Sequence, residues 1–205
     1  MNQSLRTIYS THHHTYPLKE NIRFELAHGY NATYYGQVAH NKQIDAVENG
    51  KKRALTLFHD IFKYSETIQM IFFISHNSSK SNIKKYLYKN EFKVIDSFVT
   101  NSWEDYYEGL TTVLVTETAK SNIRITKVID GICYEDFYRH GKLRIRNPFV
   151  FYNAKDNIIL NIYDDRGCDV WSDNLKRQKE LFNHYYSWIL DYDKENISRF
   201  YNSIE

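Results

Sequence analysis

The densest group of side chains that could do chemistry in this 205-residue sequence is an acidic segment near the C-terminus. Three carboxylates and one guanidinium occur within six positions, at Asp164, Asp165, Arg166 and Asp169. Carboxylates gathered at the end of a strand can hold a divalent metal or act as acid and base. On a surface they can dock a basic partner. The segment is therefore compatible with catalysis and with recognition.

The same residues also suit a tight turn between two strands. Aspartate would accept hydrogen bonds from the turn backbone and Gly167 would supply a positive φ. Arg166 would then pair with Glu25 or Asp169. Because the two adjacent aspartates point apart, they do not match the ligand spacing of a calcium loop. A structural turn is the favoured interpretation, followed by partner docking that extends to Asp173, and then by catalysis.

A second group of charged residues alternates with apolar ones. Lys142, Arg144 and Arg146 are separated by Leu143 and Ile145, and on a strand this alternation would put the three cations on one face. Such a stripe could contact anions such as phosphates. An edge strand kept soluble by its charges shows the same pattern and is the favoured interpretation.

The overall composition does not favour nucleic-acid binding or metal chemistry. The 27 basic and 25 acidic residues leave a net charge of +2, whereas dedicated nucleic-acid binders carry a clear basic excess. Cys133 and Cys168 lack zinc-ligand spacing, and Cys133 falls among apolar helix positions, so we expect it to be buried and inert. Glycine-rich phosphate loops, G-x-S-x-G and H-E-x-x-H motifs do not occur. We therefore expect no metal and no cofactor, we assign no catalytic residue, and enzymatic activity is uncertain and less favoured.

The sequence also carries no membrane signal. A bilayer span needs roughly 18 apolar residues, and the longest apolar run here covers only Met70 to Ile74. The segment 1–19 is polar and contains His12 to His14 in a row, without the charged-then-apolar pattern of a secretion signal. We expect this segment to be irregular and the protein to be cytoplasmic, without membrane contact.

Hydrophobic periodicity predicts the elements that would position these groups. Strands are indicated by alternation, or by apolar and β-branched runs, over 21–27, 67–75 and 111–118. Helices are indicated by 3.6-residue spacing or by a capping serine over about 44–63, 81–88 and 123–138. The run over 67–75 is apolar nearly throughout, which is typical of a central strand covered on both faces. The stretch 94–99 fits either type of element.

The C-terminal part of the chain, 149–205, is predicted to form a β-meander followed by two closing helices. The strands are expected over 149–152, 158–163 and 168–171, joined by a five-residue loop and by the turn at Gly167. Asp173 is the predicted N-cap of a helix that reaches about Leu190, and Asp193 that of a last helix. The whole chain, 1–205, is thus expected to be one α+β domain, with a single mixed or antiparallel sheet packed by about four or five helices.

Two segments resemble a known bacterial family. The pentapeptide Ile-Arg-Phe-Glu-Leu at 22–26 and the sequence Tyr-Asp-Asp-Arg-Gly-Cys-Asp-Val at 163–170 are similar to motifs of domain-of-unknown-function family 3885. The stretch 188–193 resembles the closing helix junction of that family. The resemblance implies a bacterial origin and the family fold, but no established activity. Small orphan domains of this kind often occur among toxin–immunity clusters, which favours a role in recognition.

From these observations we expect a non-enzymatic protein-binding module, of the type of a bacterial immunity protein that neutralises a toxin by occlusion. The partner would be another protein, such as a basic toxin domain, and nucleic acid is an unlikely partner. The expected contact residues are Asp164, Asp165, Arg166, Asp169 and Asp173. The alternative is a metal- or nucleotide-dependent enzyme that uses the carboxylates of the Asp164-Asp165-Arg166 segment. It would require a deep pocket lined by those groups.

Overall fold

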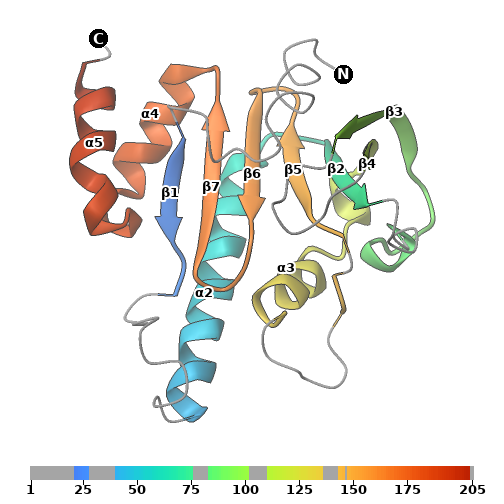
Figure 1. Ribbon diagram of the computed structural model, residues 1–205, viewed down its shortest axis with the longest axis horizontal. Coiled ribbons are helices and arrows are strands. Elements are labelled where there is room, and N and C mark those ends of the chain that lie inside the picture. Colours follow the sequence, from blue (N-terminus) through green and yellow to red (C-terminus); the bar gives the residue numbers. More distant parts are fainter. Residues whose placement is uncertain are drawn as a thin grey trace.

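A seven-stranded antiparallel sheet organises the molecule, with the strand order β1-β7-β6-β5-β2-β4-β3 (Figure 1). The computed structural model describes residues 21–27, 40–75, 83–101, 110–135, 143–145 and 147–203. The strands are β1 (Ile22–Glu25), β2 (Thr67–Ser75), β3 (Lys93–Asn101), β4 (Leu110–Ala119), β5 (Phe149–Asn153), β6 (Ile158–Ile162) and β7 (Gly167–Ser172). The expected α+β class, the antiparallel sheet and the C-terminal meander β5-β6-β7 are confirmed.

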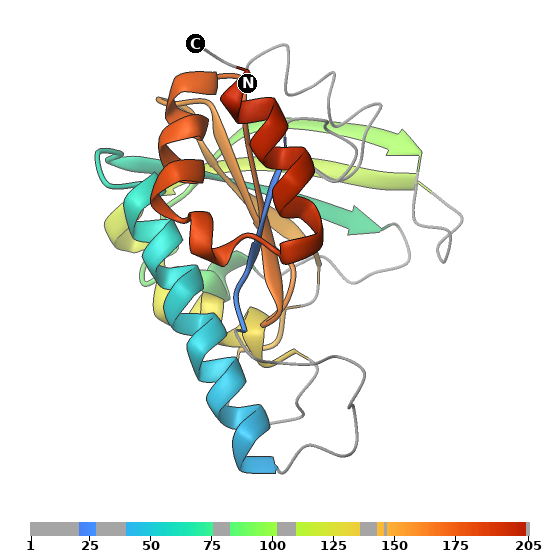
Figure 2. The same cartoon turned by 90° about the vertical axis from the view of Figure 1, so that its left-hand side faces the viewer.

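The helices of the described residues pack together on one face of this sheet (Figure 2). They are α2 (His40–Ile61), α3 (Ile125–Cys133), α4 (Leu175–His184) and α5 (Asp191–Asn202), with short 3₁₀ turns over Ile83–Tyr86, Lys120–Asn122 and Tyr186–Trp188. In Figure 2 the strands β2, β3 and β4 extend away from the helices, because the sheet is strongly twisted. The helices therefore cover mainly the β1-β7-β6-β5 half.

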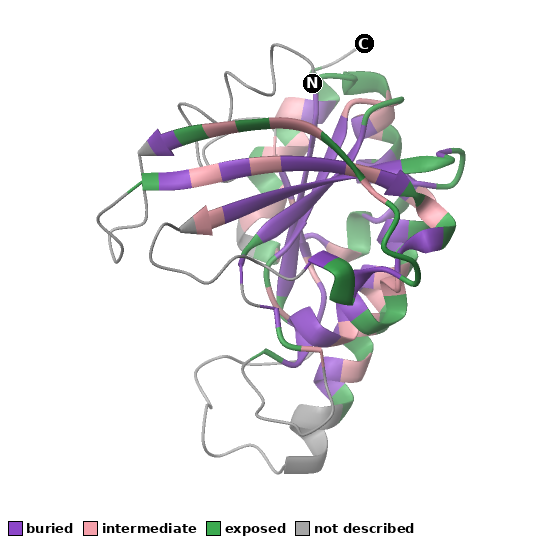
Figure 3. Ribbon diagram, turned by 90° about the vertical axis from the view of Figure 1, so that its right-hand side faces the viewer, coloured by how far each residue is buried: buried purple, intermediate pink, exposed green. Residues whose placement is uncertain are grey.

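Successive side chains of each strand point to opposite faces of the sheet, and apolar side chains are buried on both faces. The face toward the helices carries, among others, Ile22, Phe24, Leu160 and Val170. A second apolar cluster lies on the opposite face and contains Ile71, Phe73, Val113, Val115, Val150, Tyr152, Ile159 and Trp171. Burial on both faces is visible along the central strands in Figure 3. The sequence prediction that 67–75 is a central strand is confirmed, since β2 lies between β5 and β4.

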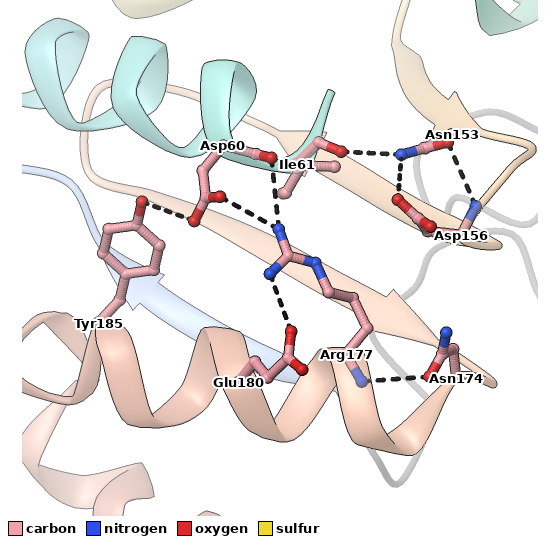
Figure 4. Close-up of polar contacts among 8 residues, drawn as sticks. All are labelled: Asp60, Ile61, Asn153, Asp156, Asn174, Arg177, Glu180 and Tyr185. Carbon is pink, nitrogen blue, oxygen red and sulfur yellow. Dashed lines mark hydrogen bonds and ion pairs between the residues drawn. The ribbon is translucent and has the colours of Figure 1, made fainter. Parts of the chain in front are cut away.

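The C-terminal end of α2 is fixed by a polar cluster (Figure 4). The Arg177 guanidinium of α4 lies 3.1 Å from the Asp60 carboxylate, and the Tyr185 hydroxyl donates to the same carboxylate at 3.0 Å. The Asn153 side chain, at the end of β5, donates to the backbone oxygen of Ile61 at 2.8 Å. These contacts connect α2 with α4 and with the β5–β6 turn.

The two closing helices are present, but their predicted starts are wrong. Asn174, not Asp173, caps α4, because its side chain accepts a hydrogen bond from the Arg177 backbone at 3.1 Å. Leu190 precedes α5 and Asp193 lies within its first turn. The first helix also ends at His184, well before Leu190, since the chain there changes to a 3₁₀ turn. The N-cap of α4 is one residue away from the predicted one, which sequence alone rarely resolves, and that of α5 is three residues away.

The expected cationic strand over 142–146 is not formed in the part that the structure describes. Residues 143–145 belong to no strand, so the alternation of charge does not follow a sheet edge there. Arg144 is exposed and Ile145 is buried. Lys142 and Arg146 lie outside the described residues, as do the segment 1–19 and Ser81. The ambiguous stretch 94–99 is part of β3, and the helix expected over 123–138 is the shorter α3.

Asn153 provides a test of the α2 cluster. It is 1% exposed, and its carbonyl oxygen also accepts the backbone N–H of Lys155 at 3.0 Å. Asn153→Ala should lower the free energy of unfolding by about 2–3 kcal/mol, because it leaves buried backbone groups without their partner. Chemical denaturation measures this, with Asn90→Ala at an exposed position as the control, expected to stay within about 0.5 kcal/mol. Equal effects of the two substitutions would contradict the assigned role of Asn153.

Candidate functional site

The acidic segment forms the turn between β6 and β7, and Asp164 holds it. One carboxylate oxygen of Asp164 accepts the backbone N–H groups of Arg166 at 2.7 Å and of Gly167 at 3.2 Å. Its other oxygen binds the Arg166 side chain, with the Nε atom at 2.7 Å. The predicted pairing of Arg166 with Glu25 or Asp169 is therefore replaced by a local pair. The carboxylate satisfies the turn backbone, as expected for a structural turn. Gly167, however, is the first residue of β7 and does not adopt the positive φ that we predicted.

The next residue, Asp165, points into the protein and is 1% exposed. Its backbone oxygen lies against Gly50 of α2, where an added Cβ would come within 2.4 Å of that oxygen. The backbone N–H of Leu26 donates to the Arg166 oxygen at 2.8 Å. Burial, together with the charges of Asp165 and Asp164, raises the pKa of the Cys133 thiol, so this cysteine stays protonated. The turn is thus packed tightly onto α2 and the end of β1.

Asp169 forms a long-range ion pair within the sheet. It lies directly opposite Arg23 in the β1–β7 register, and the Arg23 Nε atom is 3.0 Å from an Asp169 carboxylate oxygen. The Asp169 side chain is 3% exposed. Burial raises the pKa of Asp169, while the hydrogen bond from Arg23 opposes that rise. The ion pair with Arg23 therefore offsets part of the cost of burying this carboxylate.

Asn161 of β6 extends this pair into a polar row across three strands. In the β6–β7 register it is the partner of Asp169 on the side away from Arg23. The row, which we call the Arg23–Asp169–Asn161 row, lies on the sheet face opposite the helices, because the alternate residues Phe24, Cys168 and Leu160 belong to the core on the helix side. The polar side chains of neighbouring strands thus line up on one surface.

This row is one wall of a cavity of about 470 Å³. The described residues that line it also include an apolar set, namely Phe73, Ile132, Ile145, Phe149, Val150 and Ile162. Tyr163, Glu135 and Pro148 line the cavity and are exposed, so its mouth lies beside them. The Tyr163 ring extends over Gly167, where a Cβ would lie 2.2 Å from the tyrosine hydroxyl oxygen. A mostly apolar hollow of this size with a few convergent polar groups is typical of a binding site.

The structure does not bring the predicted contact residues together on one surface. Asp165 and Asp169 are buried, and Asp164 is occupied by the turn. Asp173 is exposed, but it follows the last residue of β7, whereas Asp164 precedes the first. A strand of six residues separates its ends by about 20 Å, so these carboxylates cannot form the continuous acidic docking surface that we expected. Arg166 is exposed beside the turn.

Sequence reasoning missed Arg23, Asn161 and Tyr163 as residues of a site. A signal was present, because Asn161 and Asp169 are polar residues inside otherwise apolar strands. A buried polar side chain in such a position needs a partner, and the partner of Asp169 is the single cation of the N-terminal strand motif. The identity of that partner depends on the pairing of β1 with β7, which no local pattern reveals.

Two further properties of the described residues bear on the class of protein. No group of three or more His, Cys, Asp or Glu side chains among them could hold a metal ion. None of the helices in the described ranges is both long and apolar enough to cross a membrane. Fold and cavity together define an α+β protein with a preformed hollow between the Arg23–Asp169–Asn161 row and an apolar wall that includes Ile132 of α3.

The chain belongs to a bacterial family described as Domain of unknown function (DUF3885), whose model matches residues 1–193. It is similar to the "Uncharacterized protein YnaE" of Bacillus subtilis (strain 168), with 36% identity over 75 residues. That match covers 35% of this chain and 35% of the relative, so the chain spans about a third of the length of that protein. No solved structure matches the chain. The resemblance of the two sequence motifs to this family is therefore confirmed.

The role of Asp164 in the turn can be tested by two substitutions. Asp164→Ala should lower the free energy of unfolding by about 1–2 kcal/mol, because two backbone N–H groups lose their acceptor. Asp164→Asn should cost less, since its amide oxygen can still accept from them. Urea denaturation measures both, with the exposed Asp173→Ala as the control, expected to stay within about 0.5 kcal/mol. An Asn variant as unstable as the Ala variant would argue against the backbone contacts.

Tyr163 should make stability depend on alkaline pH. Burial and the neighbouring Asp169 charge raise the pKa of Tyr163, so the folded protein keeps a proton that the unfolded chain loses near pH 10. Unfolding then releases a proton, and stability must fall as pH rises through that range. Tyr163→Phe should reduce the loss of urea stability between about pH 7 and pH 10.5. Tyr88→Phe, at an exposed position, is the control, and an unchanged loss in Tyr163→Phe would contradict the assignment.

Proposed function

We propose that the chain is a protein-binding module of the immunity type, which recognises its partner at the mouth of the cavity. The observation that carries the proposal is the 470 Å³ hollow with the exposed Tyr163 in its lining, followed three residues later by the exposed Arg166 of the same turn. Tyr163 is 40% exposed, and the Arg166 side chain is 44% exposed. Tyrosine and arginine are among the residues that dominate the binding energy of protein interfaces.

The rigidity of the turn supports this proposal. Asp164 binds its backbone, α2 packs against it at Gly50, and Leu26 donates to it from the end of β1. Tyr163 and Arg166 are therefore presented from a backbone that is held at several points. A contact surface that is ordered before binding loses less conformational entropy when the complex forms.

The proposed mechanism remains steric occlusion of a toxin's active site, with a different set of contacts from those expected. Asp165 and Asp169 are buried, so the binding surface moves from the carboxylates to Tyr163 and the cavity mouth. Glu135, exposed at the mouth, adds a carboxylate there that suits a basic toxin domain. The expectation that small orphan domains of this kind occur among toxin–immunity clusters also favours recognition.

The enzymatic alternative receives less support from the geometry. It requires the carboxylates of Asp164 and Asp165, with Arg166, to line a pocket. Asp164 and Arg166 bind one another in the turn, and Asp165 is buried next to α2. The described residues that line the cavity include none of the three.

The proposal can be tested with the purified chain and the product of the gene adjacent to its own. We expect a complex by isothermal titration calorimetry and rescue of growth when the two are expressed together. Tyr163→Ala should weaken the affinity at least about tenfold, which corresponds to 1.4 kcal/mol. Tyr88→Ala, which removes another exposed tyrosine, should leave the affinity within about twofold.

Two results would contradict the proposal. The first is a neighbouring toxin that the chain neither binds nor neutralises. The second is a complex whose affinity is the same for the wild type and Tyr163→Ala, because the mouth of the cavity would then lie outside the interface.

A further inference from the structure

The two kinds of wall in the cavity define the chemistry of what can occupy it. We infer that the occupant is an uncharged aromatic group with one hydrogen-bond donor, supplied by the partner protein as a tyrosine or tryptophan side chain. This inference rests on the proposed function, since it names the part of the partner that enters the mouth. It follows from the lining residues, their charges and the cavity size.

The apolar wall favours a ring. Phe73 and Phe149 supply aromatic surface, while Ile132, Ile145 and Ile162 supply aliphatic surface from α3, the segment before β5, and β6. An aromatic side chain buries a large apolar area at low cost in conformational entropy, and it gains further from edge or offset contacts with other rings. A hollow of about 470 Å³ lies in the range that encloses a small molecule, so a whole side chain fits.

The polar wall favours a donor. A carboxylate is an acceptor only, with room for more than one hydrogen bond on its two oxygens. Asp169 takes one from Arg23 and one from the Asn21 side chain, which leaves acceptor capacity on its two oxygens. It lines the cavity beside Asn161, whose amide can also accept. A phenol O–H or an indole N–H that reaches this row would find an acceptor in a mostly apolar site, where such a bond counts more than in water.

The balance of charge favours an uncharged group. The described lining residues carry two carboxylates, Asp169 and Glu135, and one guanidinium, Arg23. An anionic ligand would meet net repulsion there. A cation would lose its hydration in an apolar hollow, while the nearest buried carboxylate, Asp169, is already paired with Arg23. Neither ion is therefore suited to the site.

The experiment uses free analogues of side chains and the full chain, without the partner. p-Cresol represents tyrosine, toluene has the same ring without the donor, and 4-methylbenzoate replaces the donor by an anion. In methyl-detected NMR titrations we expect p-cresol to shift the methyl signals of Ile132, Ile145 and Ile162 saturably. Toluene should bind about two- to tenfold more weakly, because one hydrogen bond is lost. 4-Methylbenzoate should bind at least about tenfold more weakly.

A variant separates the polar wall from the apolar wall. Asn161→Leu keeps a side chain of similar size and removes the amide. The substitution should weaken the affinity for p-cresol about three- to tenfold relative to wild type. The affinity for toluene should stay the same or increase. Val99→Leu, at an exposed position on β3, is the control and should leave both affinities unchanged.

Three results would overturn the inference. They are the absence of saturable shifts at the cavity methyls up to about 10 mM p-cresol, tighter binding of 4-methylbenzoate than of p-cresol, and an equal effect of Asn161→Leu on p-cresol and toluene. The partner assay is independent of these probes. If p-cresol does not bind but the chain still forms a complex with the toxin, only the inference of an aromatic occupant is overturned. Binding of p-cresol without any toxin complex overturns the proposed function and the partner as the source of the group.

Discussion

The buried ion pair between Arg23 and Asp169 is the constraint on which the arrangement of this sheet depends. The two residues are separated by 146 positions in the chain and belong to strands that only the finished fold brings together. Removing two charges from water costs several kcal/mol for each ion, and the cost is offset only when their geometry is good. Here the residues are directly opposite in register and 3.0 Å apart. A slip of β1 by one residue would place Phe24 on the polar row and the guanidinium in the core, so the pair and the hydrophobic alternation select the same register.

This register also determines how the C-terminal helices close the molecule. β1 is an edge strand of four residues, and its outer side pairs at Phe24 with Ile189, in the segment between α4 and α5. The Phe24 ring contacts Tyr185 edge to face, with 6.0 Å between the centroids, and the Tyr185 hydroxyl binds Asp60 of α2 (Figure 4). A continuous set of contacts thus runs from the edge strand through α4 to the long helix. An exposed edge is a liability for aggregation, and here the closing segment covers it.

Local patterns were sufficient to predict most elements, but not their partners. Alternation in 22–25 and the apolar run at 67–75 predicted β1 and β2, because strand burial depends on side chains of the strand itself. The N-cap of α4 was missed because Asp173 and Asn174 are adjacent and both can cap a helix. The sheet order, in which β5 is inserted beside β2, could not be predicted, since it depends on contacts between distant segments. The polar row was missed for the same reason: Asp169 was expected in the strand 168–171, but its pairing with Arg23 depends on the β1–β7 register.

The acidic segment shows why residues of one type within six positions can have separate functions. Asp164 lies before the turn, where its carboxylate reaches the two following backbone N–H groups, and Arg166 compensates its charge locally. Asp165 follows with the opposite orientation and is buried against α2. Asp169 is already in the strand, so its direction is determined by the period of two, which aligns it with Asn161 and the cavity. The carboxylates that cluster in the sequence therefore act separately. The turn aspartate positions Tyr163 at the mouth, and the strand aspartate defines the polarity inside it, so recognition would depend on both without either one being a surface charge.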